Sequence, residues 1–183
     1  MGKQYTDLMV DIETLGLTPD AKILSISAVA FNPFDENPDY LQYPTFDCLV
    51  DVDSQETRTV DLSTVDWWSQ QEEEVKEKIF SETGRISLQD ALSQFALFAR
   101  NRKRIWAQGV TVDITILSHA MRQHDIPLPW LYFAVSDSRS ILDLVEVDSI
   151  PATHDSILDC FRQVMNLQQA FKKLGIKKFV RTK

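Results

Sequence analysis

One stretch near the start of the chain, residues 8–14 (LMVDIET), constrains the fold most, because an apolar run leads directly into two acids. In a β-strand successive side chains point to opposite faces, so Asp11 and Glu13 would share one face. Acids are unfavourable in strands, and two carboxylates about 4 Å apart repel by ~1 kcal/mol in water and ~4 kcal/mol at an effective dielectric near 20. A hard divalent cation such as Mg²⁺, which prefers oxygen ligands, would turn this repulsion into attraction. The alternative is a strand end whose acids face water, and the choice depends on whether other acids join the pair.

The length and composition are those of a globular domain. The 183 residues are enough for a continuous core, and we expect a single domain over residues 1–183. No apolar run approaches the ~20 residues of a membrane span, so no membrane partner and no secretory leader are expected. The two cysteines, Cys48 and Cys160, indicate no disulfide framework, and the expected compartment is therefore the reducing cytoplasm.

The net charge of −8 is unevenly distributed. Residues 172–183 form a basic tail of charge +6, which leaves −14 for residues 1–171. A second basic run covers residues 100–104. Such runs can follow a phosphate backbone, but both also follow predicted helices, where cations complement the helix dipole. Charge alone therefore does not identify the partner.

Apolar periodicity and turn residues predict an α/β fold with a mixed five-stranded sheet flanked by helices. The predicted strands cover residues 8–13, 23–31, 46–52, 105–107 and 131–135. Capping boxes at residues 63–66 and 87–90 predict the starts of two helices, and a charged helix is predicted for residues 72–80. Further helices are predicted from Asp113, ended by Pro127, from a cap at Asp137 or Ser138 to about Val145, and after Pro151. The last has a predicted buried stripe of Ile157, Phe161, Val164 and Phe171.

Two adjacent tryptophans, Trp67 and Trp68, lie in the first turns of the helix predicted for residues 65–71. Adjacent helical positions point about 100° apart, so both side chains can be buried only where the helix lies between two surfaces. Either both belong to the core, or one is exposed and stacks on a nucleobase, which is worth ~1–3 kcal/mol per base. We expect one tryptophan to be a core residue, and the role of the other stays open.

Two further acids lie where a carboxylate can meet the first pair. Asp113 is at the first turn of a predicted helix, where its simpler role is to complement the dipole, with Thr111 as a competing cap. Asp159 falls on a helix face expected to pack inward, so it lies at the edge of that face or binds a metal. His154 is five positions earlier and would point about 140° away if both were helical. It can therefore reach the same site only from the loop that enters the helix.

Three segments resemble the motifs of the DnaQ-like 3′→5′ exonucleases, in the same order and at similar separations. Residues 11–14 (DIET) look like the first motif, and residues 106–113 (WAQGVTVD) are similar to the second. Residues 154–159 (HDSILD) match the third in its His-x4-Asp form, which is typical of the DEDDh class. The resemblance spans roughly residues 8–174, and residues 63–71 further resemble the small exonucleases of the phage exonuclease A and mycobacterial exoribonuclease type.

The resemblance implies a ribonuclease-H-like sheet with Asp11 and Glu13 on its central strand. It implies that Asp11, Glu13 and Asp159 bind one Mg²⁺ or Mn²⁺ ion, and that Asp11 with the substrate phosphate holds a second. Asp113 would act mainly through a water ligand. His154 would be the general base, a task suited to a side chain that titrates near neutrality. The substrate contacts implied are Thr14, Leu15, Trp67, Trp68 and Gln108.

The activity that the resemblance implies is two-metal-dependent 3′→5′ exonuclease cleavage, which releases nucleoside monophosphates from the 3′ ends of single-stranded nucleic acid. DNA is slightly favoured over RNA on the phage-like resemblance. The alternatives are an exoribonuclease acting on RNA 3′ overhangs, an endonuclease with the same chemistry, and a module of the same fold that binds nucleic acid without cleaving it. Binding alone requires no general base, so the complete set of acids with His154 favours an enzyme. A homodimer is compatible with the sequence.

Overall fold

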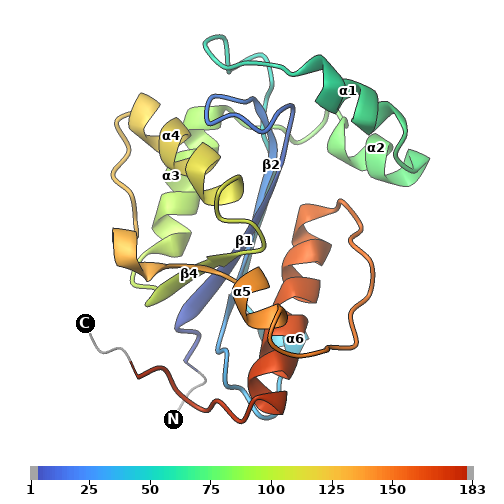
Figure 1. Cartoon of the computed structure of the whole chain (residues 1–183). Coiled ribbons are helices and arrows are strands. Elements are labelled where there is room, and N and C mark those ends of the chain that lie inside the picture. The colour runs from blue at the N-terminus through green and yellow to red at the C-terminus, as the bar shows by residue number, and fades with distance from the viewer. Residues whose placement is uncertain (1–3, 181–183) are drawn as a thin grey trace.

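The computed structural model describes residues 4–180, whose strands form one five-stranded sheet (Figure 1). The strands are β1 (Asp7–Thr14), β2 (Ile23–Phe31), β3 (Thr45–Leu49), β4 (Arg104–Ala107) and β5 (Val135–Asp137). They lie in the order β3-β2-β1-β4-β5, so that β1 is central. β2 is antiparallel to β1 and β3, whereas β4 is parallel to β1 and β5. The predicted mixed sheet is confirmed.

Helices cover both faces of the sheet. They are α1 (Leu62–Ser69), α2 (Glu73–Ile79), α3 (Leu88–Ala99), α4 (Asp113–Gln123), α5 (Arg139–Leu142) and α6 (Ser156–Lys173), with short 3-10 turns η1 (Tyr40–Gln42) and η2 (Tyr132–Ala134). Figure 1 shows α3 and α4 on one face of the sheet and α6 on the other. The helices α1 and α2 lie beyond the N-terminal end of β2. Within residues 4–180, no helix combines the length and the apolar character that crossing a membrane requires.

Alternation along β1 sends its side chains into two different layers. Leu8, Val10 and Ile12 are buried in the core that includes α3 and α4, whereas Met9 packs in the core of α6. Because side chains alternate, Asp11 and Glu13 lie on the face of Met9, towards α6. The predicted common face of the two acids is therefore confirmed, and it is the face that α6 covers.

The close approach of α6 to the sheet depends on small side chains in β2. The Ser156 hydroxyl, at the first residue of α6, lies 2.9 Å from the Ser25 hydroxyl and 2.6 Å from the Ser27 hydroxyl. All three side chains are buried. One turn further along, the fully buried Cys160 thiol donates to the Ser27 carbonyl at 3.5 Å. These contacts press the first turns of α6 onto β2 and so fix the height of Asp159 relative to β1.

The two predicted capping boxes have different outcomes. Ser87 caps α3 as predicted, because its hydroxyl accepts a hydrogen bond from the Asp90 N–H at 3.1 Å. The helix predicted for residues 65–71 instead begins at Leu62, so the assignment of its cap to Ser63 is wrong. Asp61 is the cap, and its carboxylate accepts from the Ser63 N–H at 2.8 Å.

Several other boundaries differ from the prediction. Most of the strand predicted for residues 131–135 is the 3-10 turn η2, and β5 begins only at Val135, where pairing with β4 starts. The third strand ends at Leu49 rather than at residue 52, and α5 ends at Leu142 rather than near residue 145. These short elements depend on contacts that are distant in sequence, which a local pattern does not contain.

The buried stripe of α6 is only partly the predicted one. Val164 and Phe171 are buried, but Ile157 and Phe161 are partly exposed. Cys160 takes the buried position that the periodicity assigned to its neighbours. At the end of α6 and beyond it, the basic side chains of the described part of the tail are exposed, and Arg181 and Lys183 lie outside the described residues.

Candidate active site

The central strand loses a neighbour just before its two acids. The parallel ladder between β1 and β4 pairs residues up to Met9 with Trp106 and then stops. The Ile12 N–H, which lies between the two acids in sequence, instead donates to a carboxylate oxygen of Asp113 at 3.3 Å. The end of β4 therefore opens a place beside Asp11 and Glu13 that the Asp113 carboxylate occupies.

A tight turn brings Asp113 to that place. Gly109 has a φ of +126°, a conformation that favours glycine, and a side chain there would meet the Arg139 guanidinium at 3.5 Å. The turn is closed by the Val112 N–H, which donates to the Gly109 carbonyl at 2.9 Å. Thr111 is exposed, and no side chain caps α4. The buried Asp113 carboxylate thus points to β1 rather than acting as a cap.

Asp159 is held by three donors at the start of α6. Its carboxylate accepts from the Thr153 N–H at 3.0 Å and from the His154 N–H at 2.9 Å. The buried Arg162 side chain donates through Nε at 2.8 Å, one turn along the same helix. His154 has a φ of +57°, in the left-handed region that residues other than glycine seldom adopt. This conformation lies in the loop before α6, and it turns the loop so that both backbone amides face Asp159.

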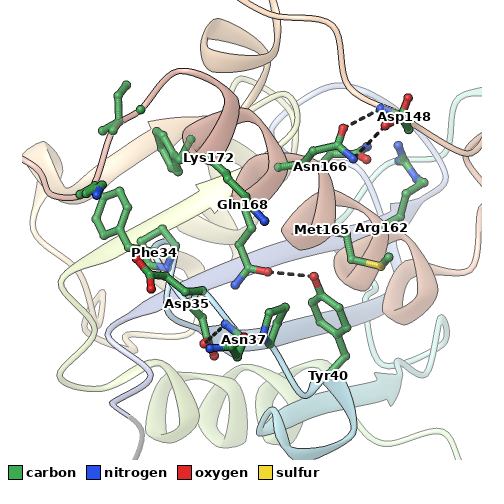
Figure 2. Close-up of a pocket in the computed structure, with 18 of the residues that line it drawn as sticks. Phe34, Asp35, Asn37, Tyr40, Asp148, Arg162, Met165, Asn166, Gln168 and Lys172 are labelled. Atoms are coloured by element: carbon green, nitrogen blue, oxygen red, sulfur yellow. Dashed lines mark hydrogen bonds between the residues drawn. The ribbon is translucent and has the colours of Figure 1, made fainter.

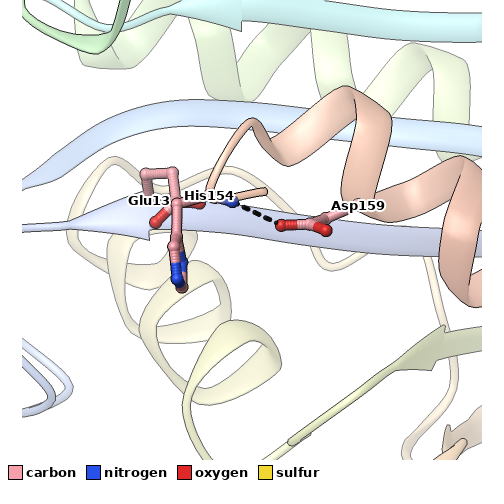
Figure 3. A group of neighbouring side chains, drawn as sticks. All are labelled: Glu13, His154 and Asp159. Carbon is pink, nitrogen blue, oxygen red and sulfur yellow. Dashed lines mark hydrogen bonds between the residues drawn. The ribbon is translucent and has the colours of Figure 1, made fainter. Parts of the chain in front are cut away.

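Side chains from three separate segments meet at this point (Figure 3). One ligand atom from each of Glu13, His154 and Asp159 lies within 4.8 Å of the others. Asp11 lies on the same face of β1 and accepts a hydrogen bond from the Gln163 amide of α6 at 2.7 Å. The five residues that the sequence predicts for the site, including Asp113, are therefore brought together by β1, α4, α6 and the loop before α6.

The crowding of carboxylates has a clear electrostatic signature. Burial, with the Asp113 charge as a second cause, raises the pKa of Asp11 well above its ordinary range. Burial and the neighbouring Asp11 charge raise the pKa of Glu13 to about 10, and burial raises that of Asp113 to about 7. At neutral pH Glu13 therefore keeps its proton and Asp113 is partly protonated, unless a cation takes the place of the protons. A set of carboxylate oxygens is the donor set that Mg²⁺ and Mn²⁺ prefer, so the residues fit such ions.

Two positioning residues were missed from the sequence. Arg162 and Gln163, adjacent on α6, contact Asp159 and Asp11 respectively, yet neither lies in a recognisable motif. The available signal was the spacing, because residues three and four positions after Asp159 lie on its face of the helix. Polar residues at such positions can orient metal-binding carboxylates.

The predicted substrate contacts are placed unevenly. Trp68 is 2% exposed, and its indole N–H donates to the Thr14 carbonyl at 2.9 Å, so it is the predicted core residue of the pair and is not placed to contact substrate. Trp67 is 39% exposed and is the tryptophan of the pair that a base can reach. Thr14 and Leu15 are mostly buried beside Glu13, whereas Gln108 is partly exposed, with a buried side-chain oxygen that has no protein partner.

Comparison with known proteins adds a match over most of the chain. A family model described as the 3′-5′ exoribonuclease Rv2179c-like domain matches residues 6–171. The exodeoxyribonuclease of Enterobacteria phage T4 is 24% identical over 207 residues, which cover 91% of this chain and 89% of that protein.

Solved structures share the fold at low sequence identity. S. pombe Pop2p in its Mg²⁺- and Mn²⁺-bound form gives a TM-score of 0.64 at 13% identity, covering 96% of this chain and 86% of that one. The nuclease domain of 3′hExo, a DEDDh family member bound to rAMP, gives 0.57 at 12% identity, covering 97% and 96%. Cell-death related nuclease 4 (CRN-4) gives 0.57 at 16% identity and covers 93% of this chain, but this chain spans only 64% of that protein. The predicted ribonuclease-H-like fold is confirmed.

Proposed function

This chain belongs to the family of the 3′-5′ exoribonuclease Rv2179c-like domain and is a 3′-5′ exonuclease of the DEDDh type, and from this premise we propose its substrate and its catalytic residues. The proposed reaction removes nucleoside monophosphates one at a time from the 3′ end of single-stranded DNA. The observation that carries the proposal is the meeting of Glu13, His154 and Asp159 within 4.8 Å, beside Asp11 and Asp113.

In this proposal the four acids Asp11, Glu13, Asp113 and Asp159 hold two divalent ions. When bound, such ions neutralise the scissile phosphate and stabilise charge on the attacking and leaving oxygens. The carboxylates are fixed before the substrate arrives, since Asp159 has its backbone and Arg162 donors and Asp11 has the Gln163 amide. The role of the protein is therefore mainly to hold the scissile phosphate at the correct position relative to the general base, His154.

His154 takes the proton from the attacking water. The water oxygen forms a bond to phosphorus, the bond from phosphorus to the 3′ oxygen of the preceding nucleotide breaks, and that oxygen becomes the new 3′ hydroxyl when it is protonated. The backbone of His154 is tied to the site, because its N–H donates to the Asp159 carboxylate at 2.9 Å. This hydrogen bond fixes the loop that carries the general base relative to the Asp159 carboxylate.

The preference for DNA is supported by the T4 relative, whose name is exodeoxyribonuclease and which matches almost the whole chain. The family description favours RNA as the second candidate. Matched 5′-labelled single strands of DNA and RNA with identical sequence, incubated with Mg²⁺ or Mn²⁺, decide between them. We expect stepwise shortening, faster for DNA. Faster shortening of RNA would reverse the preference, internal cuts would indicate an endonuclease, and a bound but intact strand would indicate a binding module.

The catalytic assignment has its own test on the same strands. Asp11→Asn should abolish shortening with an unchanged circular dichroism spectrum, because it removes a charge that the ions require. His154→Ala should lower kcat by at least about 100-fold, within the range for loss of a general base. Asp125→Asn is the matched control, since Asp125 is exposed beyond the end of α4. Full activity in His154→Ala would show that His154 is not the general base.

The homodimer stays a prediction, which sedimentation equilibrium would test.

A further inference from the structure

The exposed tryptophan of α1 is already in contact with the proposed general base. The ring centroids of Trp67 and His154 are 4.8 Å apart, and their planes meet at 87°, which is an edge-to-face arrangement. Aromatic rings favour this geometry because the positive edge of one meets the negative face of the other. The two residues are far apart in sequence, so the contact joins α1 to the loop before α6.

The imidazole of His154 is otherwise weakly held. Its backbone N–H is bound by Asp159, but within residues 4–180 no hydrogen bond to either imidazole nitrogen is present. The left-handed φ of His154 fixes the direction in which the side chain leaves the backbone, yet not the rotation of the ring. Among the hydrogen bonds and ring contacts of the described residues, the Trp67 indole is the one that meets this ring and so restricts its rotation.

Trp67 is itself carried on a fixed support. Trp68, the next residue, is buried and donates to the Thr14 carbonyl, directly after Glu13. The two indoles lie 5.0 Å apart, and the Trp68 ring packs on Phe80 at 5.7 Å. One tryptophan thus anchors α1 to the strand that carries the acids, and the other reaches the base.

A second contact joins the same helical unit to the loop. Lys78 of α2 lies 2.5 Å from a carboxylate oxygen of Asp155, the residue that follows His154. The lysine is half-exposed, so the pair adds little stability, but it lies beside the residue whose orientation is at issue. Both helices of the α1–α2 unit, residues 62–79, therefore contact this loop, α1 at His154 and α2 at Asp155.

We propose that Trp67 is a positioning residue that holds the His154 imidazole in the orientation needed to accept the proton of the attacking water. The inference rests on the proposed role of His154 as general base. It differs from stacking of Trp67 on a nucleobase, because positioning affects the chemical step whereas stacking affects substrate binding.

The test is a double-mutant cycle measured as kcat and KM on a single-stranded DNA substrate. Trp67→Leu, which keeps an apolar side chain but no ring, should lower kcat by roughly 3- to 10-fold, the worth of an edge-to-face contact, with KM unchanged. Trp67→Phe, which keeps a ring, should recover most of that loss. In the His154→Ala background, Trp67→Leu should have no further effect on kcat. Val65→Ala is the control, because Val65 lies on the same helix and is exposed.

Each other outcome overturns the inference in a distinguishable way. A raised KM with unchanged kcat, persisting in the His154→Ala background, would assign Trp67 to nucleobase stacking. Equal loss of kcat in both backgrounds, together with a lowered melting temperature, would assign it to structure alone. Full activity of His154→Ala, or a wild-type protein that shortens no strand, would overturn the proposed function and the inference with it. Unchanged kcat in Trp67→Leu, with His154→Ala strongly impaired, would overturn the inference alone.

Discussion

At the scale of single residues, the site combines buried carboxylates with one buried cation. Asp159 and Arg162 form an ion pair whose side chains are 5% and 9% exposed. Taking two charges out of water is costly, and the pair is tolerated because Asp159 has two backbone donors in addition to the guanidinium. Arg162 therefore compensates one negative charge, and within residues 4–180 the other three acids of the site form no ion pair.

The first prediction follows from this pair. Arg162→Leu removes the cation and leaves the Asp159 charge buried without its partner, so the free energy of unfolding in EDTA should fall by about 3–5 kcal/mol. Urea denaturation followed by circular dichroism measures the change. Arg122→Leu is the control, since Arg122 is exposed on the last turn of α4, and its effect should stay within about 0.5 kcal/mol. A loss in Arg162→Leu no larger than in this control would show that the pair contributes nothing.

At the scale of elements, the height of α6 on the sheet is set by the serines of β2. Ser27 lies under the first turn of α6, where its hydroxyl contacts Ser156 at 2.6 Å and donates to Asp47 at 2.6 Å. Ser25, Ser27 and Ser156 are all buried, and their hydroxyls already lie within hydrogen-bond distance across the interface. A larger side chain there must lift α6, and Asp159 would move with it, away from Asp11 and Glu13.

The second prediction uses this fit. Ser27→Val should lower the free energy of unfolding by about 1–3 kcal/mol through overpacking, and should also lower kcat at saturating metal. Ser27→Ala has the same hydrogen-bond loss without the added volume, so it should keep kcat near the wild-type value. Denaturation curves and stopped-time gel assays give the two quantities. Equal kcat in both variants would separate the position of α6 from catalysis.

The elements also show what local sequence can predict. The strand Ile23–Phe31, the cap at Ser87 and the shared face of Asp11 and Glu13 were predicted correctly, because each follows from a period or a cap within a few residues. The strand predicted for residues 131–135 was wrong, since β5 exists only through parallel pairing with β4, some thirty positions earlier in the chain.

The same limit applies to the site. The resemblance predicted Asp11, Glu13, Asp113, Asp159 and His154, and the structure brings these five residues together. The role of Gln163 could not be predicted, because it depends on which face α6 turns to a strand about 150 residues away. Arg162 is three positions from Asp159 on the same helix, so only the spacing pointed to it. The sequence could not predict which of Trp67 and Trp68 is buried. Trp68 is the buried one because its indole meets the Thr14 carbonyl, a contact distant in sequence that apolar periodicity does not reveal.

At the scale of the whole molecule, the acids link stability to pH and metal. The folded-state pKa values of Glu13 and Asp113, about 10 and about 7, lie above their ordinary values. Between pH 5 and 7 the folded state therefore holds protons that the unfolded state has lost, and the free energy of unfolding falls as pH rises. The Asp113 contribution to this fall ends near pH 7 and that of Glu13 near pH 10.

The third prediction joins the two variables. In EDTA the melting temperature should fall from pH 5.5 to pH 8, whereas Mn²⁺ at about 100 times its Kd should raise it by about 5–10 °C at pH 8. The rise should be smaller at pH 5.5, because the ion must then displace protons from the same acids. Differential scanning calorimetry at both pH values checks this, with Glu13→Gln as the variant in which both effects shrink. A melting temperature insensitive to Mn²⁺ at pH 8 would contradict a metal site.

The early end of β4 has one further consequence. The active site forms where β4 ends early. If β4 were longer, the Ile12 N–H would donate to a β4 carbonyl, and the Asp113 carboxylate would lose its place beside β1. Two more strand-forming residues inserted after Ala107 would extend the pairing of β4 with β1 and displace the Asp113 carboxylate. Nuclease activity therefore depends on β4 being only four residues long.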